Sequence, residues 1–194
     1  MTSRWSGGTT TELYIYPPES SYGERNFDLR ISTASVETAT STFTKLPGIR
    51  RHLIILDGEI QLYPENQNQR KMGKGDKIFF PGDWDMRSTG NCIDFNVMTS
   101  KKIESALDTM TIQENTCREL LLTPSWRSVF LYCVSGLCNL RLDQEIIPVS
   151  DGMLLLITGH DLEHCMLCAE TTTELILVSS DSGFAENQAS IKRD

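Results

Sequence analysis

The sequence predicts an all-β protein, either a sandwich or a barrel, and three observations support this prediction. Apolar residues stand in short runs rich in β-branched side chains, separated by glycine, proline, asparagine and aspartate. Several of these runs alternate between apolar and polar residues, which is the period of a half-buried strand. The order of runs and turns in the first half of the chain then recurs in the second half.

The first half contains the clearest expected strands. Residues 27–36 alternate strictly, so that apolar side chains face one way and polar side chains the other. Residues 52–56 run into Asp57-Gly58, a dipeptide typical of tight turns, and residues 59–63 resume the apolar pattern, which predicts a hairpin. Further strands are expected at residues 13–16, 78–80 and 92–98.

The middle of the chain has a different pattern. Ile103, Leu107 and Met110 follow one another at spacings of four and three residues, which fits one face of a helix. We therefore expect a short helical connector within residues 101–116.

A repeat relates the two halves. Gly58 and Gly136 stand 78 residues apart in similar surroundings, and Gly75-Asp76 has a counterpart in Asp151-Gly152. The shared offset favours two related β units, although chance matches between glycine-containing strands are the alternative.

Charge and composition exclude several classes of function. The 194 residues include 26 acidic and 18 basic side chains, a net charge of -8, which argues against binding nucleic acid. No apolar run reaches the length of a membrane span, and the first residues lack a signal-peptide pattern, so we expect a cytoplasmic protein with no membrane contact. The six cysteines are then expected to be reduced thiols packed in the core.

A glycine-aspartate turn followed by a strand that ends in Pro81-Gly82 resembles the second motif of cupin barrels. The resemblance implies two cupin-like β-barrels, a bicupin. The expected boundaries are an N-terminal barrel at residues 1–100, the connector at 101–116, a C-terminal barrel at 117–180 and a polar tail at 181–194.

Metal binding is not expected. Cupin enzymes hold their metal mainly through histidines, whereas this chain has three histidines and no His-x-His pair. His160, His164, Cys165 and Cys168 have a spacing that resembles a zinc site, but the two cysteines would face opposite sides of a strand. We therefore expect neither a metal nor another cofactor, with a zinc ion at these four residues as the alternative.

Arg30 is the most informative charged residue, because it lies in the middle of an expected strand. Its polar face, shared with Ser32, can line the interior of a barrel. Asp94 and Asn96 lie two residues apart on another expected strand and share a face, and Glu12 supplies a further carboxylate. A guanidinium in such an interior implies a small anionic ligand or a buried partner within the protein, for which Glu12, Asp94 and Asn96 are available, and solvated surface ion pairs are the alternative.

Several motifs, in order along residues 5–98, resemble the HutD/Ves family. They are Trp5-Ser-Gly-Gly-Thr-Thr-Thr-Glu12, Arg25-Asn-Phe27-Asp-Leu-Arg30-Ile-Ser32, Leu46-Pro-Gly48-Ile-Arg50-Arg51, Phe80-Pro-Gly82-Asp83 and Asp94-Phe95-Asn96-Val97-Met98. The second half resembles the family only in its pattern of short apolar runs separated by turn residues. The first motif departs from other members, which have a longer glycine run preceded by asparagine.

The resemblance implies a metal-free bicupin associated with histidine utilisation, which senses or buffers an intermediate such as N-formylglutamate. The ligand-binding residues that it implies are Trp5, Thr10, Glu12, Arg30, Ser32, Arg51, Asp94 and Asn96.

Three functions follow as hypotheses. The first is a small-molecule-binding protein in which Arg30 or Arg51 binds the anion and Trp5 closes the mouth of the first barrel. The second is an isomerase or hydrolase that uses Glu12 or Asp94 as a general base. The third is an interaction module with two solidly packed barrels, for which a homodimer would bury the alternating apolar faces.

Overall fold

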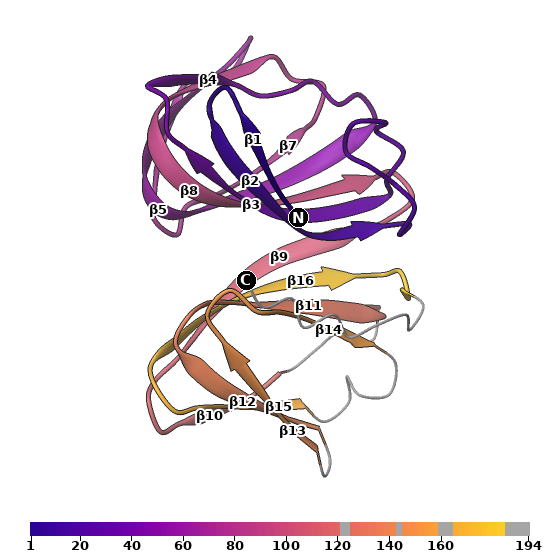
Figure 1. Cartoon of the computed structure of the whole chain (residues 1–194), viewed down its shortest axis with the longest axis vertical. Coiled ribbons are helices and arrows are strands. Elements are labelled where there is room, and N and C mark those ends of the chain that lie inside the picture. Colours follow the sequence, from indigo (N-terminus) through magenta and orange to yellow (C-terminus); the bar gives the residue numbers. More distant parts are fainter. Residues whose placement is uncertain (121–124, 143–144, 159–164, 185–194) are drawn as a thin grey trace. The chain divides into compact units, whose positions relative to one another are not determined.

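The computed structural model describes residues 1–120, 125–142, 145–158 and 165–184. Within these ranges the regular structure consists of strands alone, which confirms the all-β prediction (Figure 1). The chain divides into an N-terminal unit, Met1–Ile103, and a C-terminal unit, Glu104–Asp194. No helix of the described residues is long and apolar enough to cross a membrane.

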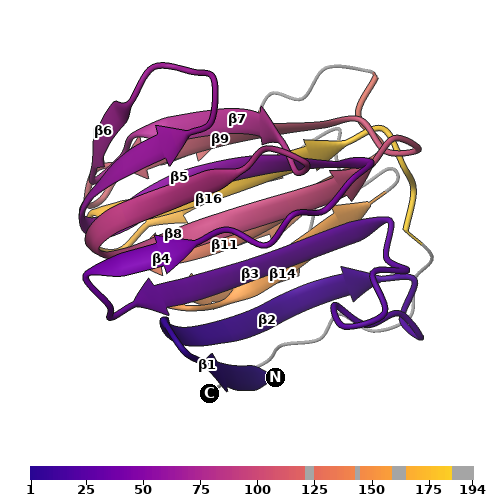
Figure 2. The ribbon, with the colours of Figure 1, turned by 90° about the horizontal axis from the view of Figure 1, so that it is seen from above.

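The N-terminal unit contains one eight-stranded sheet. Its strands are β1 (Thr2–Trp5), β2 (Gly8–Tyr16), β3 (Leu29–Val36), β4 (Thr40–Thr42), β5 (Ile49–Pro64), β6 (Arg70–Gly73), β7 (Lys77–Pro81) and β8 (Met86–Ser100). The main order is β1-β2-β3-β8-β5-β6, with β4 paired to β8 and β7 paired to β5. Figure 2 shows β2, β3, β8 and β5 side by side. Pairing among the described strands does not close the sheet into a barrel.

Strands β5 and β8 are long and continuous, so the hairpin expected at Asp57-Gly58 is wrong. The dipeptide instead lies inside β5, next to a register shift between Ile55 and Asp57. Gly58 has a φ of 78°, and a Cβ added to it would lie 2.4 Å from the carbonyl oxygen of Asn91. Glycine is therefore required at this bend, because only it combines a positive φ with such a close approach of two strands.

The bend gives the sheet an inner face. Leu53 and Ile55 before the register shift, and Ile60 and Leu62 after it, belong to one buried cluster. The extra residue at the bulge keeps all four side chains on the same side of β5, although 55 and 60 differ by an odd number. Apolar residues of both halves of the strand therefore pack together inside the unit.

The C-terminal unit contains two four-stranded sheets. Its strands are β9 (Ser105–Ile112), β10 (Cys117–Glu119), β11 (Ser128–Ser135), β12 (Leu137–Leu142), β13 (Glu145–Ser150), β14 (Leu154–Thr158), β15 (Cys165–Ala169) and β16 (Thr173–Ser180). The orders are β14-β11-β16-β9 and β10-β15-β12-β13. Side chains of both sheets form one apolar cluster, and the described residues of this unit bury no charged side chain.

The helical connector predicted at residues 101–116 is wrong. Ser105–Ile112 forms strand β9, which pairs with β16 over eight consecutive residues. Three apolar residues at helical spacing were too few to identify a helix, and the pairing of the whole segment with a buried neighbour decides in favour of a strand.

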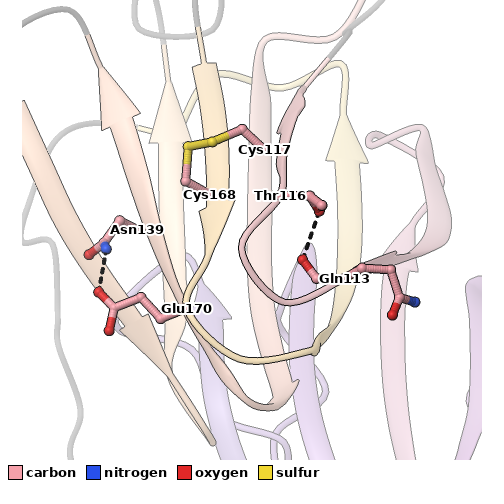
Figure 3. The surroundings of a disulfide bond; sticks show 6 residues. All are labelled: Gln113, Thr116, Cys117, Asn139, Cys168 and Glu170. Atoms are coloured by element: carbon pink, nitrogen blue, oxygen red, sulfur yellow. Dashed lines mark hydrogen bonds between the residues drawn. A yellow bond between two sulfur atoms is a disulfide. The ribbon is translucent and has the colours of Figure 1, made fainter.

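Two cysteines correct the expectation of six reduced thiols. Cys117 on β10 and Cys168 on β15 are directly paired and form a disulfide with an S–S distance of 2.02 Å (Figure 3). The free cysteines of the described residues, Cys92, Cys133 and Cys165 among them, are buried. Burial raises the pKa of the Cys133 thiol to about 12, so this group stays protonated and unreactive.

The alternative zinc site does not form as the spacing suggested. Cys168 is in the disulfide, and Cys165 lies in the apolar cluster of the C-terminal unit. His160 and His164 lie outside the described residues. Among the residues that are described, no three histidine, cysteine, aspartate or glutamate side chains are grouped so that they could hold a metal ion.

Candidate functional site

Strand pairing brings the polar residues of the N-terminal unit onto one face. Glu12 on β2 lies opposite Ser32 on β3, and Ser32 lies opposite Asn96 on β8. Asn96 in turn lies opposite Leu53 of the inner apolar cluster. Because directly paired residues point to the same side of a sheet, this whole row faces inward.

The neighbouring rows add three charged residues to the inner face. Arg30 on β3 and Arg51 on β5 flank Met98 of β8 from opposite sides. Asp94 lies between Ala34 and Ile55 in the row on the other side of Asn96. We call Arg30, Ser32, Arg51, Asp94 and Asn96 the polar cluster, and all five are buried.

Arg30 is held by partners within the protein. Its Nε donates a hydrogen bond to Glu12 Oε2 at 2.8 Å, and its Nη1 donates to Ser32 Oγ at 3.1 Å. The guanidinium also lies over the ring of Tyr22, 4.5 Å from the centroid. The Arg30 side chain is 6% exposed and that of Glu12 is 25% exposed, so this ion pair runs from the buried cluster toward solvent. Arg30 thus faces the interior, as the sequence predicted.

Arg51 is less completely partnered. Its guanidinium lies over the rings of both Phe43 and Phe80, at 5.1 and 5.2 Å from their centroids, while its Nε is buried without a hydrogen-bond partner. Burial lowers the Arg51 pKa to about 10; Tyr22 and Asp94 oppose this shift and Arg30 adds to it. The side chain therefore remains positively charged at neutral pH.

Asp94 and Asn96 each have a side-chain oxygen that receives no hydrogen bond from the protein. Asp94 Oδ1 and Asn96 Oδ1 are both buried and neither accepts a hydrogen bond. Burial raises the pKa of the Asp94 carboxyl from 3.8 to about 7, against the opposing effect of the positive charge on Arg51. Near neutral pH this carboxyl therefore changes its charge.

The polar cluster is suited to binding a polar molecule. A buried polar atom without a partner costs about 1–3 kcal/mol, so such atoms are rare in folded proteins. Here one donor, Arg51 Nε on β5, and two acceptors, on Asp94 and Asn96 of β8, lie on the same face of two adjacent strands. A ligand that accepts from Arg51 and donates to β8 would satisfy all three.

Trp5 lies on the edge strand β1, and Thr10 lies on β2 opposite Ala34, in the row that contains Asp94. The indole Nε1 of Trp5 donates to Thr10 Oγ1 at 3.2 Å, and Trp5 is 37% exposed on strand β1. The hydrogen bond joins these two residues to each other rather than to the arginines. The structure thus brings together six of the eight expected residues, places Thr10 on the same strand as Glu12, and leaves Trp5 on the edge strand β1.

Aromatic side chains are the part of the site that the sequence analysis missed. Phe80 is the direct partner of Arg51 in the pairing of β7 with β5, and Phe43 and Tyr22 also cover guanidinium groups. Phe80 belongs to the Phe80-Pro-Gly82 motif, so a signal was present, but only the strand register shows which arginine it covers.

Comparison with solved structures shows the fold class. The chain is similar to a cupin 2 conserved barrel domain protein from Leptotrichia buccalis, with a TM-score of 0.57, 12% identity, and coverage of 92% of this chain and 91% of that one. A conserved protein of unknown function from Pseudomonas aeruginosa PAO1 gives a TM-score of 0.79 at 18% identity, with 94% of each chain covered. The fold is therefore cupin-like.

The family follows from a second comparison. The HutD family model matches residues 1–177, so the chain belongs to the HutD family. HutD from Pseudomonas fluorescens SBW25 is similar in structure, with a TM-score of 0.67, 17% identity, and coverage of 94% of this chain and 95% of that one. No curated protein matches the sequence. The resemblance inferred from the motifs is thus confirmed for HutD.

Proposed function

We propose that this protein binds a small carboxylate at the polar cluster of the N-terminal unit, without a metal, and acts as a sensor or buffer of that compound. The observation that carries the proposal is the charged, buried guanidinium of Arg51, whose Nε has no partner. A guanidinium offers several donors in a plane and matches the geometry of a carboxylate. The HutD family suggests an intermediate of histidine degradation, similar to N-formylglutamate, as the ligand.

The same proposal assigns different roles to the two units, which we take to be two cupin barrels. The N-terminal unit buries two arginines and an aspartate, whereas the apolar cluster of the C-terminal unit consists of aliphatic side chains and thiols. Ligand binding therefore belongs to the N-terminal unit. A cytoplasmic location and a homodimer stay predictions.

Binding can be tested with the purified full chain and a panel of carboxylates comprising histidine, urocanate, N-formylglutamate, glutamate and citrate. Thermal shift identifies the compounds that bind, and isothermal titration calorimetry measures their affinity. A ligand present at about 100 times its Kd should stabilise the protein by about 2.7 kcal/mol. We expect Arg51→Gln to weaken binding at least tenfold, because glutamine lacks the positive charge.

Arg50→Gln is the matched control. Arg50 is the neighbour of Arg51 on β5 and points to the opposite face, where its Nη2 donates to the carbonyl oxygen of Ile103 at 2.6 Å. This variant should keep the wild-type affinity. The proposal is wrong if no compound of the panel binds to the folded wild type, or if a bound compound keeps its affinity in Arg51→Gln.

A second candidate function is supported by Asp94. A general base works best when its pKa lies near the operating pH, and burial places the pKa of Asp94 at about 7. An isomerase or hydrolase that uses Asp94 would therefore be active near neutral pH. Glu12 suits this role less well, because it already accepts a hydrogen bond from Arg30. Turnover of a panel compound by the wild type and its loss in Asp94→Asn would favour the enzyme.

A further inference from the structure

The unpartnered atoms of β8 restrict the chemistry of the ligand. Asp94 Oδ1 and Asn96 Oδ1 are acceptors, and they lie two residues apart on the same face of the strand. A compound that carries carboxylates alone can accept from Arg51 but offers nothing to these two oxygens. An N–H or O–H group on the ligand would give them the donor that the protein itself does not supply.

We propose that the ligand is a carboxylate that also carries a neutral N–H or O–H donor, and that Asp94 selects it by accepting this donor while ionised. The inference rests on the proposed function, since it assumes that a carboxylate binds at the polar cluster. It makes Asp94 a determinant of specificity, in addition to the arginines that attract the anion. A site built to hydrogen-bond a polar group rejects an analogue that lacks the group.

The surroundings of Asp94 make its own ionisation the main variable near neutral pH. The charged or titratable groups on its inner face are Arg51 on β5, Arg30 on β3, Glu12 on β2 and Cys92 on β8, with Tyr22, between β2 and β3, lying against the Arg30 guanidinium. Among the groups with shifted pKa values, Arg51, with a pKa of about 10, stays positively charged between pH 6 and 8, and Cys92, with a pKa of about 12, stays neutral. Asp94, at about 7, loses its proton in this interval.

Two probes of equal charge isolate the donor. Glutarate and N-formylglutamate are both dianions between pH 6 and 8. Their negative charges therefore raise the pKa of Asp94 by a similar amount. Only N-formylglutamate carries an N–H group. A hydrogen bond to an ionised acceptor is stronger than one to a neutral acceptor. The ratio of the glutarate Kd to the N-formylglutamate Kd should therefore increase about fivefold from pH 6 to pH 8.

The experiment is calorimetric titration of the folded wild type, Asp94→Asn and Asp57→Asn at pH 6, 7 and 8. A third probe, 2-hydroxyglutarate, offers an O–H donor and should behave like N-formylglutamate. In Asp94→Asn the ratio should not change with pH, because the amide has a similar shape but does not titrate. Asp57 is exposed on the neighbouring strand β5, so Asp57→Asn should reproduce the wild type.

The outcomes separate the role of Asp94 from carboxylate binding at the polar cluster. A ratio that is constant with pH in the wild type, or that changes equally in Asp94→Asn, overturns the role of Asp94 while leaving carboxylate binding intact. If none of the three probes binds to the folded wild type, the inference is overturned, and the proposed function fails with it only if no compound of the carboxylate panel binds either. Circular dichroism of each variant at each pH shows that the protein titrated is folded.

Discussion

Asp94→Asn is expected to make the protein more stable at neutral pH, in contrast to most substitutions in a core. Asp94 is 5% exposed, and its Oδ1 accepts no hydrogen bond. Ionisation of this carboxyl is therefore unfavourable in the folded protein, even though Arg51 lies nearby, and burial raises its pKa from 3.8 to about 7. Asparagine has nearly the same shape and never ionises.

The sign and size of the effect follow from proton linkage. Between pH 4 and pH 7 the folded protein keeps the Asp94 proton while the unfolded chain releases it, so the wild type loses stability as the pH rises through this window. Once the pH exceeds about 7, the stability lost through this group levels off. A pKa difference of about three units corresponds to roughly 4 kcal/mol, and roughly 3 kcal/mol of this develops between pH 5 and pH 8.

Urea unfolding at pH 5, 6, 7 and 8, followed by circular dichroism, measures this difference directly. The free energy of unfolding of Asp94→Asn minus that of the wild type should increase by roughly 3 kcal/mol from pH 5 to pH 8. Asp57→Asn is the control, because its carboxylate is exposed and stays hydrated on folding. A difference that is constant across this pH range would show that Asp94 ionises normally in the folded protein, which would refute the reasoning.

Two further predictions concern the framework of the two units. Gly90→Ala should lower the free energy of unfolding by roughly 2–4 kcal/mol, because Gly90 has a φ of 102° and an added Cβ would lie 2.4 Å from the Glu59 carbonyl oxygen; an unchanged urea midpoint would contradict the close approach of β5 and β8. Cys117→Ser opens a loop of 51 residues and should cost about 4 kcal/mol. Dithiothreitol should lower the melting temperature of the wild type but not of this variant, and equal responses of both would contradict the disulfide.

Alternation along single strands was readable from the sequence because it is a local property. The shared face of Arg30 and Ser32 and that of Asp94 and Asn96 follow from the two-residue period alone, and the structure has both. The period does not tell whether the face of Arg30 is buried, and the structure decides that it is. Asp57-Gly58 shows the limit of such local patterns. The same dipeptide suits a hairpin turn or a bend in a long strand, and only its pairing with β8 distinguishes them.

The sequence by itself determined the all-β class, the family and the residue types available to the site, since each depends on composition, short-range periodicity or motifs in order. Only the tertiary structure decided that residues 105–112 form a strand, that Cys117 meets Cys168, and that Arg51 and Asp94 retain buried atoms without partners. The physical reason is register. Which residues lie opposite one another depends on how distant strands pair, and a polar atom is satisfied or left unpaired only once all of its neighbours are in place.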